Sequence, residues 1–214
     1  MTLRHFLVAA ALSFAVSTNA YAGDMIEIAE TGLASIDDVF SPVADIHTQL
    51  ADTRTKLADI DTNIRTALGV AEDSPLETAL ADLKAQAGDA LTFEMDGTTP
   101  KLSIADGADV PENVTNGVTA LQTAFGDLST IITELPTLTD KVMEAKNNGQ
   151  ALVADPKALI SQAKDSGMKG KEAMGALKTA KSNLKATGQT PDHITSTTSE
   201  ATTLLDTLTA PFKG

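Results

Sequence analysis

Residues 39–67 read VFSPVADIHTQLADTRTKLADIDTNIRTA and carry the strongest structural signal in this sequence. Apolar or small residues return at alternating steps of four and three, which is the heptad spacing of a helix that buries one stripe against other helices. Asp52 precedes Lys56 by four residues and Asp61 precedes Arg65 likewise, an order that stabilises a solvated helical face. The stretch therefore predicts a long amphipathic helix. Its predicted stripe comprises Val39, Val43, Ile46, Leu50, Thr53, Leu57, Ile60, Ile64 and Ala67.

Prolines mark where the neighbouring helices are expected to begin or bend. Helical spacing of apolar residues continues upstream to Asp24, so Ser41-Pro42 either caps a new helix or kinks a longer one. Ser74-Pro75-Leu76-Glu77 predicts a second helix, whose serine would cap it and whose glutamate would close a capping box. Asp155-Pro156 and Thr190-Pro191 predict the starts of a fourth helix and a short fifth one.

A third helix is predicted upstream of Pro136. Its stripe keeps the heptad spacing, and Pro136 should kink the chain before the stripe extends towards Asn147. Between the second and third helices, residues 91–104 alternate as a strand does, and Asp96-Gly97 suits a tight turn, which predicts a small hairpin. The stripe of the third helix comprises Val114, Val118, Leu121, Phe125, Leu128, Ile132 and Leu135.

These segments together predict an all-α fold. We expect an elongated antiparallel bundle of about four to five helices, with coiled-coil-like packing and one small β-hairpin insertion at 91–104. The chain divides into a leader at 1–22 and a single helical-bundle domain at 23–214, which is long enough to bury a core.

The leader has the three parts of a secretory signal peptide. A short basic start precedes an apolar run from Phe6 to Val16, and Ala20-Tyr21-Ala22 forms a small-x-small cleavage pattern. The apolar run is shorter than the roughly 20 residues that span a bilayer. We therefore expect cleavage near Ala22, export to the periplasm or the cell exterior, and no transmembrane span in the mature chain.

The composition excludes several classes of function. The mature chain loses Arg4, which leaves 15 basic and 29 acidic residues and a formal charge of −14, so nucleic acid is not an expected partner. The sequence contains no cysteine and no tryptophan. It has none of the motifs of zinc proteases, serine hydrolases or nucleotide-binding loops. We therefore expect a protein that is not an enzyme and that carries no cofactor or metal.

Two weaker patterns would change that expectation. Asp106-Gly107-Ala108-Asp109 with Glu112 gathers carboxylates that could bind calcium, but the ligand spacing of an EF-hand loop is missing and a simple turn is favoured. Met25 and His193 are the pair that could ligate haem, although the sequence has no covalent attachment motif.

A basic segment stands out from the acidic background. Residues 148–189 hold seven lysines against three acidic residues, a local charge of +4, whereas residues 23–113 hold 19 acidic residues against five basic ones. The lysines either form a cationic face for an anionic lipid, polymer or acidic partner, or they complement the acidic first two helices, as charge runs commonly do. The candidate cationic face comprises Lys157, Lys164, Lys171, Lys178 and Lys185.

The predicted fourth helix also carries small residues on one face. Small residues let neighbouring helices approach closely, or they leave a gap that admits an apolar ligand. Close packing is the commoner outcome. The candidate ligand or close-packing seam comprises Ala163, Gly167, Gly170, Met174 and Leu177.

The sequence leads to two functional hypotheses. The first is an exported, non-enzymatic bundle that acts by surface interaction, as a structural, adaptor or self-associating component. It would meet a protein partner or a second copy through its heptad seams, because heptads can be satisfied within a chain or between chains. The alternative is a carrier that holds an apolar small molecule or lipid between its helices.

Overall fold

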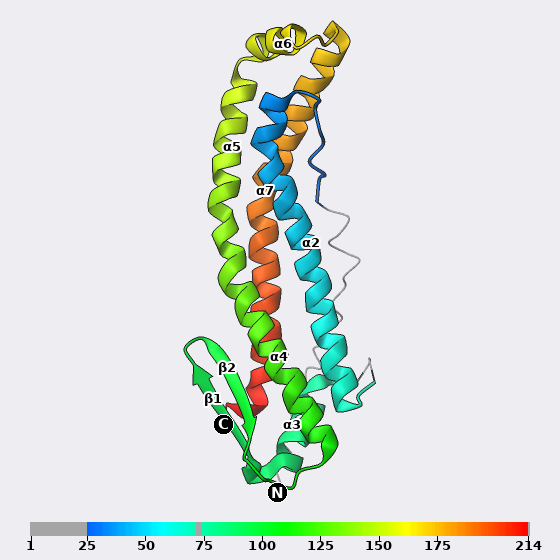
Figure 1. Cartoon of the computed structure of the whole chain (residues 1–214), viewed down its shortest axis with the longest axis vertical. Coiled ribbons are helices and arrows are strands. Elements are labelled where there is room, and N and C mark those ends of the chain that lie inside the picture. The colour runs from blue at the N-terminus through cyan, green and yellow to red at the C-terminus, as the bar shows by residue number, and fades with distance from the viewer. Residues whose placement is uncertain (1–24, 72–73, 214) are drawn as a thin grey trace, which may run out of the picture.

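The computed structural model describes residues 25–71 and 74–213, so the predicted signal peptide at 1–22 and the mature start at Gly23 lie outside the described residues. Three long helical columns form a rod, and shorter elements close its two ends (Figure 1). The elements are α2 (Ala34–Leu68), α3 (Leu76–Ala87), β1 (Leu91–Asp96), β2 (Thr99–Ile104), α4 (Glu112–Glu134), α5 (Leu138–Ala154), α6 (Pro156–Asp165) and α7 (Gly170–Thr209), with 3₁₀ turns η1 (Gly88–Ala90), η2 (Leu135–Thr137) and η3 (Ala210–Phe212).

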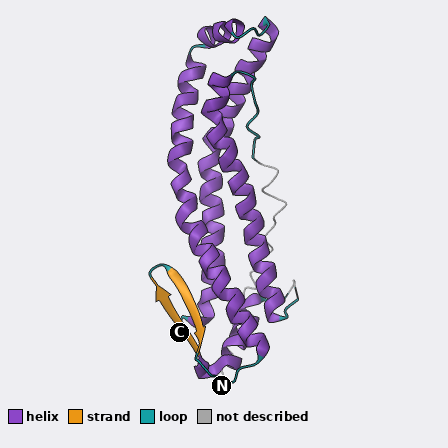
Figure 2. Cartoon of the chain, viewed as in Figure 1, coloured by secondary structure: helices purple, strands orange, loops and turns teal. Residues whose placement is uncertain are grey.

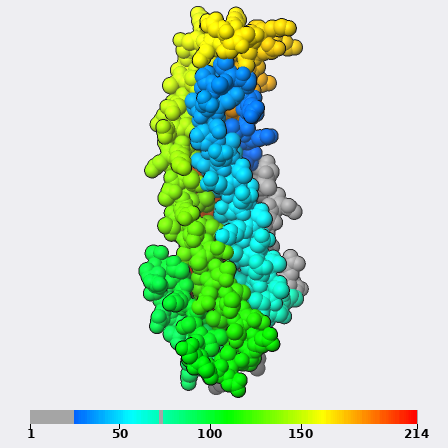
Figure 3. Space-filling model, viewed as in Figure 1, coloured from blue at the N-terminus to red at the C-terminus, as the bar shows by residue number. Residues whose placement is uncertain are grey.

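The columns are α2, then α4 joined to α5, then α7, and each runs antiparallel to the one before it along the chain (Figure 1). The predicted antiparallel helical bundle with one hairpin is therefore confirmed. The hairpin is the one place where the described chain forms strands (Figure 2). The packed rod is long and narrow, with α2 covering one side of the other columns (Figure 3).

Helix α2 is a single helix that passes through Pro42. Of the two predicted alternatives, one longer helix that includes Pro42 is therefore correct, and a new helix capped by Ser41 is wrong. The predicted helical continuation from Asp24 is wrong, because residues 25–33 are not helical. The Asp37 carboxylate accepts hydrogen bonds from the backbone N–H of Thr31 at 2.7 Å and of Gly32 at 3.1 Å. Gly32 has a φ of 76°, which favours glycine. These contacts hold an extended entry into the helix.

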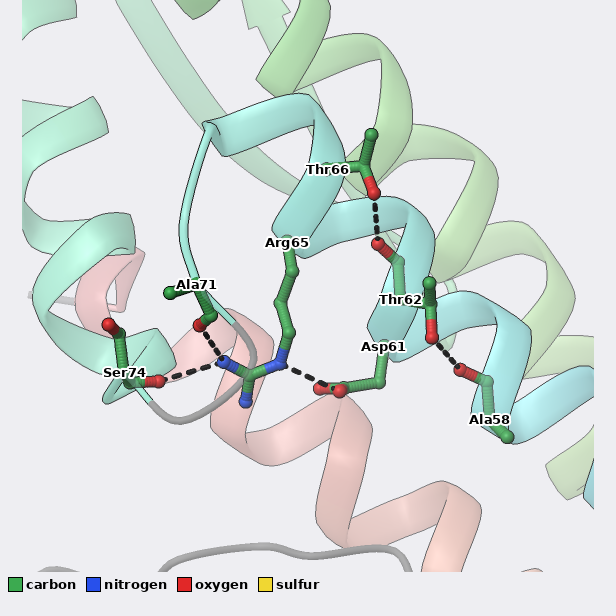
Figure 4. A network of polar contacts seen from close by, with 7 residues as sticks. All are labelled: Ala58, Asp61, Thr62, Arg65, Thr66, Ala71 and Ser74. Carbon is green, nitrogen blue, oxygen red and sulfur yellow. Dashed lines mark hydrogen bonds and ion pairs between the residues drawn. The ribbon is translucent and has the colours of Figure 1, made fainter.

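Arg65 holds the connection between α2 and α3 (Figure 4). Its Nε donates to the Asp61 carboxylate at 2.8 Å, and its Nη1 donates to the carbonyls of Ala71 at 3.3 Å and Ser74 at 2.8 Å. Helix α3 then begins at Leu76 without any side-chain cap, so the capping box predicted at 74–77 does not form. The side chain of Arg65 stabilises this junction instead.

The hairpin packs at the same end of the rod as α3. Leu91 pairs with Ile104 and Asp96 with Thr99, and Gly97 at the turn has a φ of 63°. The Phe93 ring stacks on the ring of Phe212 with a centroid distance of 6.2 Å, which attaches the hairpin to the 3₁₀ turn η3 that follows α7. Further along, the bend predicted at Pro136 is the 3₁₀ turn η2 between α4 and α5.

The boundaries of the predicted fourth and fifth helices are wrong. Helix α6 does open at Pro156, but it ends at Asp165, and α7 then continues without a break through Pro191. The reason is a heptad stripe that stays buried on both sides of this proline, because packing along a whole stripe outweighs the local preference of one residue. The buried stripe comprises Ala173, Ala176, Ala180, Asn183, Thr187, Thr190, Ile194, Thr197, Ala201, Leu204 and Leu208.

The apolar core has two parts. The lower core lies between the second half of α2, α3, α4, β2 and the end of α7, and it is built from large residues such as Leu50, Leu121 and Phe125. The upper core lies between the start of α2, α6 and the start of α7. Its large buried members are Leu33, Ile36, Phe40, Leu159 and Leu177. Its other buried members include Ala163, Ala173, Ala176 and Ala180. None of the helices in the described ranges is long and apolar enough to cross a membrane.

Candidate functional site

Helix α6 lies across the upper end of the rod (Figure 1). The Asp155 carboxylate caps it by accepting from the backbone N–H groups of Lys157 at 3.1 Å and Ala158 at 3.0 Å. Leu159 and Ala163, one turn apart, are buried in the upper core. Lys157 and Lys164, two turns apart, are exposed. The helix therefore presents one apolar face to the bundle and one basic face to solvent.

A tight turn connects α6 to α7. The backbone N–H of Gly167 donates to the carbonyl of Lys164 at 2.9 Å, and that of Met168 donates to Ala163 at 3.0 Å. Gly167 has a φ of 90°, and these two bonds with a left-handed glycine define a Schellman motif. The Glu172 carboxylate then accepts from the backbone N–H of Lys169 at 2.7 Å. This turn ends α6 early and directs the chain from across the rod into α7, which runs along it (Figure 1).

The cationic surface is formed by the lysines of α6, of the turn after it and of the first half of α7. Every one of these lysines is exposed. Among the residues that the structure describes, none of these lysines forms an ion pair; the pairs lie elsewhere, as in Lys56 with Asp127 at 2.7 Å. The complementary pairing with the acidic first helices therefore does not form as direct contacts. The cationic surface comprises Lys157, Lys164, Lys169, Lys171, Lys178, Lys181 and Lys185.

The residues of the predicted ligand or close-packing seam do not share one helix. Ala163 on α6 and Leu177 on α7 are brought together in the upper core. Gly167 lies in the turn, and Gly170 begins α7; a Cβ atom on either glycine would meet nothing within 4 Å. The side chain of Met174 is 55% exposed. The predicted single seam is therefore split into a packed part and a solvent-facing part, and this arrangement does not favour the carrier hypothesis.

Close helix packing occurs instead at Gly149 on α5. A Cβ atom built at this position would lie 2.8 Å from Cζ of Phe40 and 3.2 Å from Cδ1 of Leu184. The glycine therefore allows the Phe40 ring to lie directly against the backbone of α5. In the sequence, Gly149 indicates only a helix end, because nothing in the local pattern shows which residue will face a helical glycine.

Polar side chains cross the interior of the rod in two layers. His47 Nε2 lies 2.8 Å from the Thr190 hydroxyl, and Arg54 Nε donates to the Thr197 hydroxyl at 3.2 Å. Both pairs join α2 to α7 with the same offset of 143 residues, so the layers are one heptad apart on two parallel helices. Buried polar residues at heptad positions are a known means of fixing register, which is the role that we assign to them.

A third polar contact ties the N-terminal segment to α7. The side-chain amide of Asn183 accepts from the backbone N–H of Ala29 at 3.0 Å and donates to the carbonyl of Ala29 at 2.8 Å. These groups were not predicted, because hydrophobicity assigns their polar positions to solvent. The available signal was the four-three spacing that Asn183, Thr187, Thr190 and Thr197 share with the apolar residues of α7.

His47 is the group whose protonation is most affected by this interior. Burial lowers the pKa of His47 from its ordinary value of 6.5, and the neighbouring His193 lowers it further. A lowered pKa keeps His47 neutral at pH 7, so its ring can exchange a hydrogen bond with the Thr190 hydroxyl without a buried charge. His193 therefore acts here as an electrostatic neighbour of His47.

A shallow cleft lies at the other end of the rod, between the end of α2, α3 and the start of α4. Its described lining includes the hydroxyls of Ser74 and Thr78 and the carboxylate of Asp82, with no histidine or lysine. Within the described ranges, no group of three or more His, Asp or Glu side chains is placed to hold a metal ion. The cationic surface is accordingly the feature of this rod with the most distinct chemistry.

No protein-family model matches this chain, and neither the curated proteins nor the solved structures contain a match to it.

Proposed function

We propose that this protein is an exported, non-catalytic helical rod that acts by surface interaction and binds an anionic partner through its cationic surface. The observation that carries the proposal is the set of seven exposed lysines, none of which forms an ion pair with a described acidic side chain. Seven lysines against three acidic residues between 148 and 189 concentrate positive charge on one part of an otherwise acidic rod.

The packing of the heptad stripes supports this proposal over association through the stripes. Leu50, Leu57 and Leu121 are each at most 2% exposed, and their contacts lie inside one chain. A partner helix could reach them only if the bundle opened, at the cost of the burial that holds it together. An interaction through the outer surface needs no such opening.

Lysine footprinting in the native setting tests the proposal. An amine-reactive acetylating reagent would be applied to the undisturbed exported fraction of the host and, separately, to the purified protein, and acetylation read at each lysine by mass spectrometry. We expect Lys157, Lys164 and Lys171 to be protected in the native fraction. Lys101 and Lys141, which are also exposed and lie outside the cationic surface, are the matched controls.

Equal labelling of both lysine groups in the two samples would contradict the proposal, because a bound partner must cover the residues that it contacts. Protection of Lys101 and Lys141 alone would contradict it too, since the interaction surface would then lie elsewhere on the rod.

A further inference from the structure

We infer that the outer edge of strand β1 is a docking site for an extended segment of a partner protein in which basic and apolar side chains alternate. The hairpin lies at the other end of the rod from α6 (Figure 1). The inference therefore concerns a different surface from the proposed function and does not depend on it. An open strand edge binds an extended chain by adding it to the sheet as a further strand.

The hydrogen bonding of the hairpin shows which backbone groups of β1 face outward. The N–H of Ala105 donates to the carbonyl of Ala90 at 2.9 Å, and these residues continue the β1–β2 register. Antiparallel pairs alternate between hydrogen-bonded and non-hydrogen-bonded ones, so Phe93 and Met95 belong to non-hydrogen-bonded pairs. Their N–H and C=O groups point away from β2. Within the described part of the chain, these four groups have no hydrogen-bond partner.

The opposite edge of the hairpin is blocked. Pro100 on β2 stands opposite Met95 and has no N–H to donate. Gln122 on α4 donates its side-chain N–H to the carbonyl of Leu102, which also faces outward. A proline and a covering helix are both common means of closing a sheet edge. Strand β1 lies on the side of the hairpin away from α4 (Figure 1), so its edge is the open one.

The open edge is held in place by the bundle. Leu102 is fully buried in the lower core, and the Phe93 ring stacks on the ring of Phe212. The hairpin is therefore fixed before any partner arrives. A preformed edge loses little conformational freedom on binding, which favours association.

The side chains of β1 indicate what kind of segment fits this edge. Phe93 and Met95 lie on one face, where the Met95 side chain is 53% exposed. Glu94 and Asp96 lie on the other face, and both are exposed. An added antiparallel strand presents its own side chains alternately to the two faces. Apolar residues opposite Phe93 and Met95, with basic residues opposite Glu94 and Asp96, therefore match the edge.

The charge of this end of the rod also favours a basic segment. Residues 74–113 hold eight acidic residues against two lysines, a local charge of −6, and the whole chain carries −13. Lys101 stands opposite Glu94 on β2, and Lys213 pairs with Asp206 at 3.2 Å. These lysines leave the acidic excess in place. A second copy of the chain is a less suitable occupant, because it would bring an identical acidic hairpin to the edge.

An NMR titration of the ¹⁵N-labelled processed protein tests the inference. The probe is a capped peptide in which lysine and valine alternate. We expect the peptide to shift the amide resonances of Phe93 and Met95 and to slow their hydrogen exchange by roughly tenfold or more, because both amides gain an acceptor. The amide of Glu94, which belongs to a hydrogen-bonded pair with Lys101, should keep its exchange rate.

N-methylated peptides separate strand addition from charge attraction alone. With lysine opposite Glu94 and valine opposite Phe93 and Met95, the valine amides point towards β1 and the lysine amides point away. Methylation of the valine amides should therefore abolish binding, whereas methylation of the lysine amides should preserve it. A peptide with glutamate in place of lysine should not bind.

Variants of the protein test the backbone and the charges separately. Met95→Pro removes an outward N–H but no bond to β2, and it should weaken binding roughly tenfold. Met95→Ala keeps that N–H and is the control for the lost side chain. Glu94→Gln combined with Asp96→Asn should weaken binding roughly 2- to 30-fold. Asp45→Asn with Asp52→Asn, both exposed on α2, changes the net charge equally and should have no effect. Circular dichroism establishes that each variant is folded.

Any of four results would overturn the inference: no change at the Phe93 and Met95 amides, equal binding of the two methylated peptides, equal binding of the glutamate peptide, or unchanged binding by folded Met95→Pro. Slow exchange of both amides without peptide that becomes fast on dilution would show that a second copy occupies the edge, and the inference would again be wrong. None of these results would affect the proposed function, because lysine footprinting reports on another surface.

Discussion

The lower and upper cores fill the same heptad geometry with side chains of different size. The lower core packs Leu, Ile and Phe from four helices, strand β2 and the 3₁₀ turns η2 and η3. The smaller upper core combines four alanines of α6 and α7 with Leu33, Ile36, Phe40, Leu159 and Leu177. Because burial free energy scales with the apolar area removed from water, the lower core should hold most of the stability. The cationic surface lies on the upper half, so the proposed interaction surface and the main source of stability are separated along the rod.

The largest effect should come from removing volume from the lower core. Phe125 is fully buried, and Phe125→Ala should lower the free energy of unfolding by about 3–5 kcal/mol. Leu177→Ala in the upper core should cost about 2 kcal/mol, the lower end of the range for such substitutions. Chemical denaturation followed by circular dichroism measures both. Equal losses would show that the two cores do not differ as described.

Glycine positions in the two halves should respond with opposite sign. Gly149→Ala places a methyl group 2.8 Å from the Phe40 ring and should destabilise the upper half by about 1–3 kcal/mol, because a closely packed core resists added volume. A methyl group at Gly126 on α4 would meet no atom within 4 Å outside its own helix, so Gly126→Ala should stabilise the protein by about 0.5–1 kcal/mol. Thermal unfolding distinguishes the two outcomes, and a gain at Gly149 would mean that α5 does not approach Phe40.

The polar layers that join α2 to α7 offer an intermediate effect. Thr197→Val removes the hydroxyl that accepts from Arg54 Nε and should cost about 1–2 kcal/mol, since a charged donor loses a buried acceptor. Thr187→Val is the matched control, because the Thr187 hydroxyl donates only within its own helix, to the carbonyl of Asn183 at 2.8 Å. If both variants were equally stable, the Arg54 layer would not contribute to register or stability.

A pH dependence below neutrality should be the smallest effect. The pKa of His47 is lowered in the folded protein, by burial first and by His193 second, from its ordinary value of 6.5. The unfolded chain therefore binds more protons below about pH 6.5, and stability should fall as the pH drops below that value. Denaturation midpoints between pH 7.5 and 5 would show this slope, and His47→Gln should reduce it. A slope that His47→Gln leaves unchanged would assign the effect to other groups.

The sequence predicted the elements whose stripes are apolar. Leu50, Leu57, Leu121 and Phe125 repeat with helical spacing, so α2 and α4 could be located from hydrophobicity alone. Helix α7 could not, because Asn183, Thr187 and Thr190 occupy buried heptad positions that hydrophobicity assigns to solvent. The apolar stripe therefore stops short, and Pro191 then resembles a helix start. The extended segment before α2 was missed because it depends on Asp37, six residues after Thr31, reaching back to the backbone.

The candidate site was predictable in composition but not in shape. A lysine-rich segment is visible in the sequence, and its side chains are exposed, as an amphipathic pattern requires. The turn at Gly167 was not predicted, since a glycine within a helical pattern is compatible with either a packed seam or a helix end. That turn determines which lysines lie on α6 and which lie on α7. It also separates Ala163 from Met174, which a continuous helix would place on one face.

Native mass spectrometry of the protein from the exported fraction, after a high-salt wash, tests most directly whether the rod works through its surface. A surface-acting rod predicts the mass of the bare processed chain, or a multiple of it, because a partner held by exposed lysines is released by salt. Non-protein mass that survives the wash and leaves only on denaturation would contradict this function and indicate a carrier with a ligand inside the bundle.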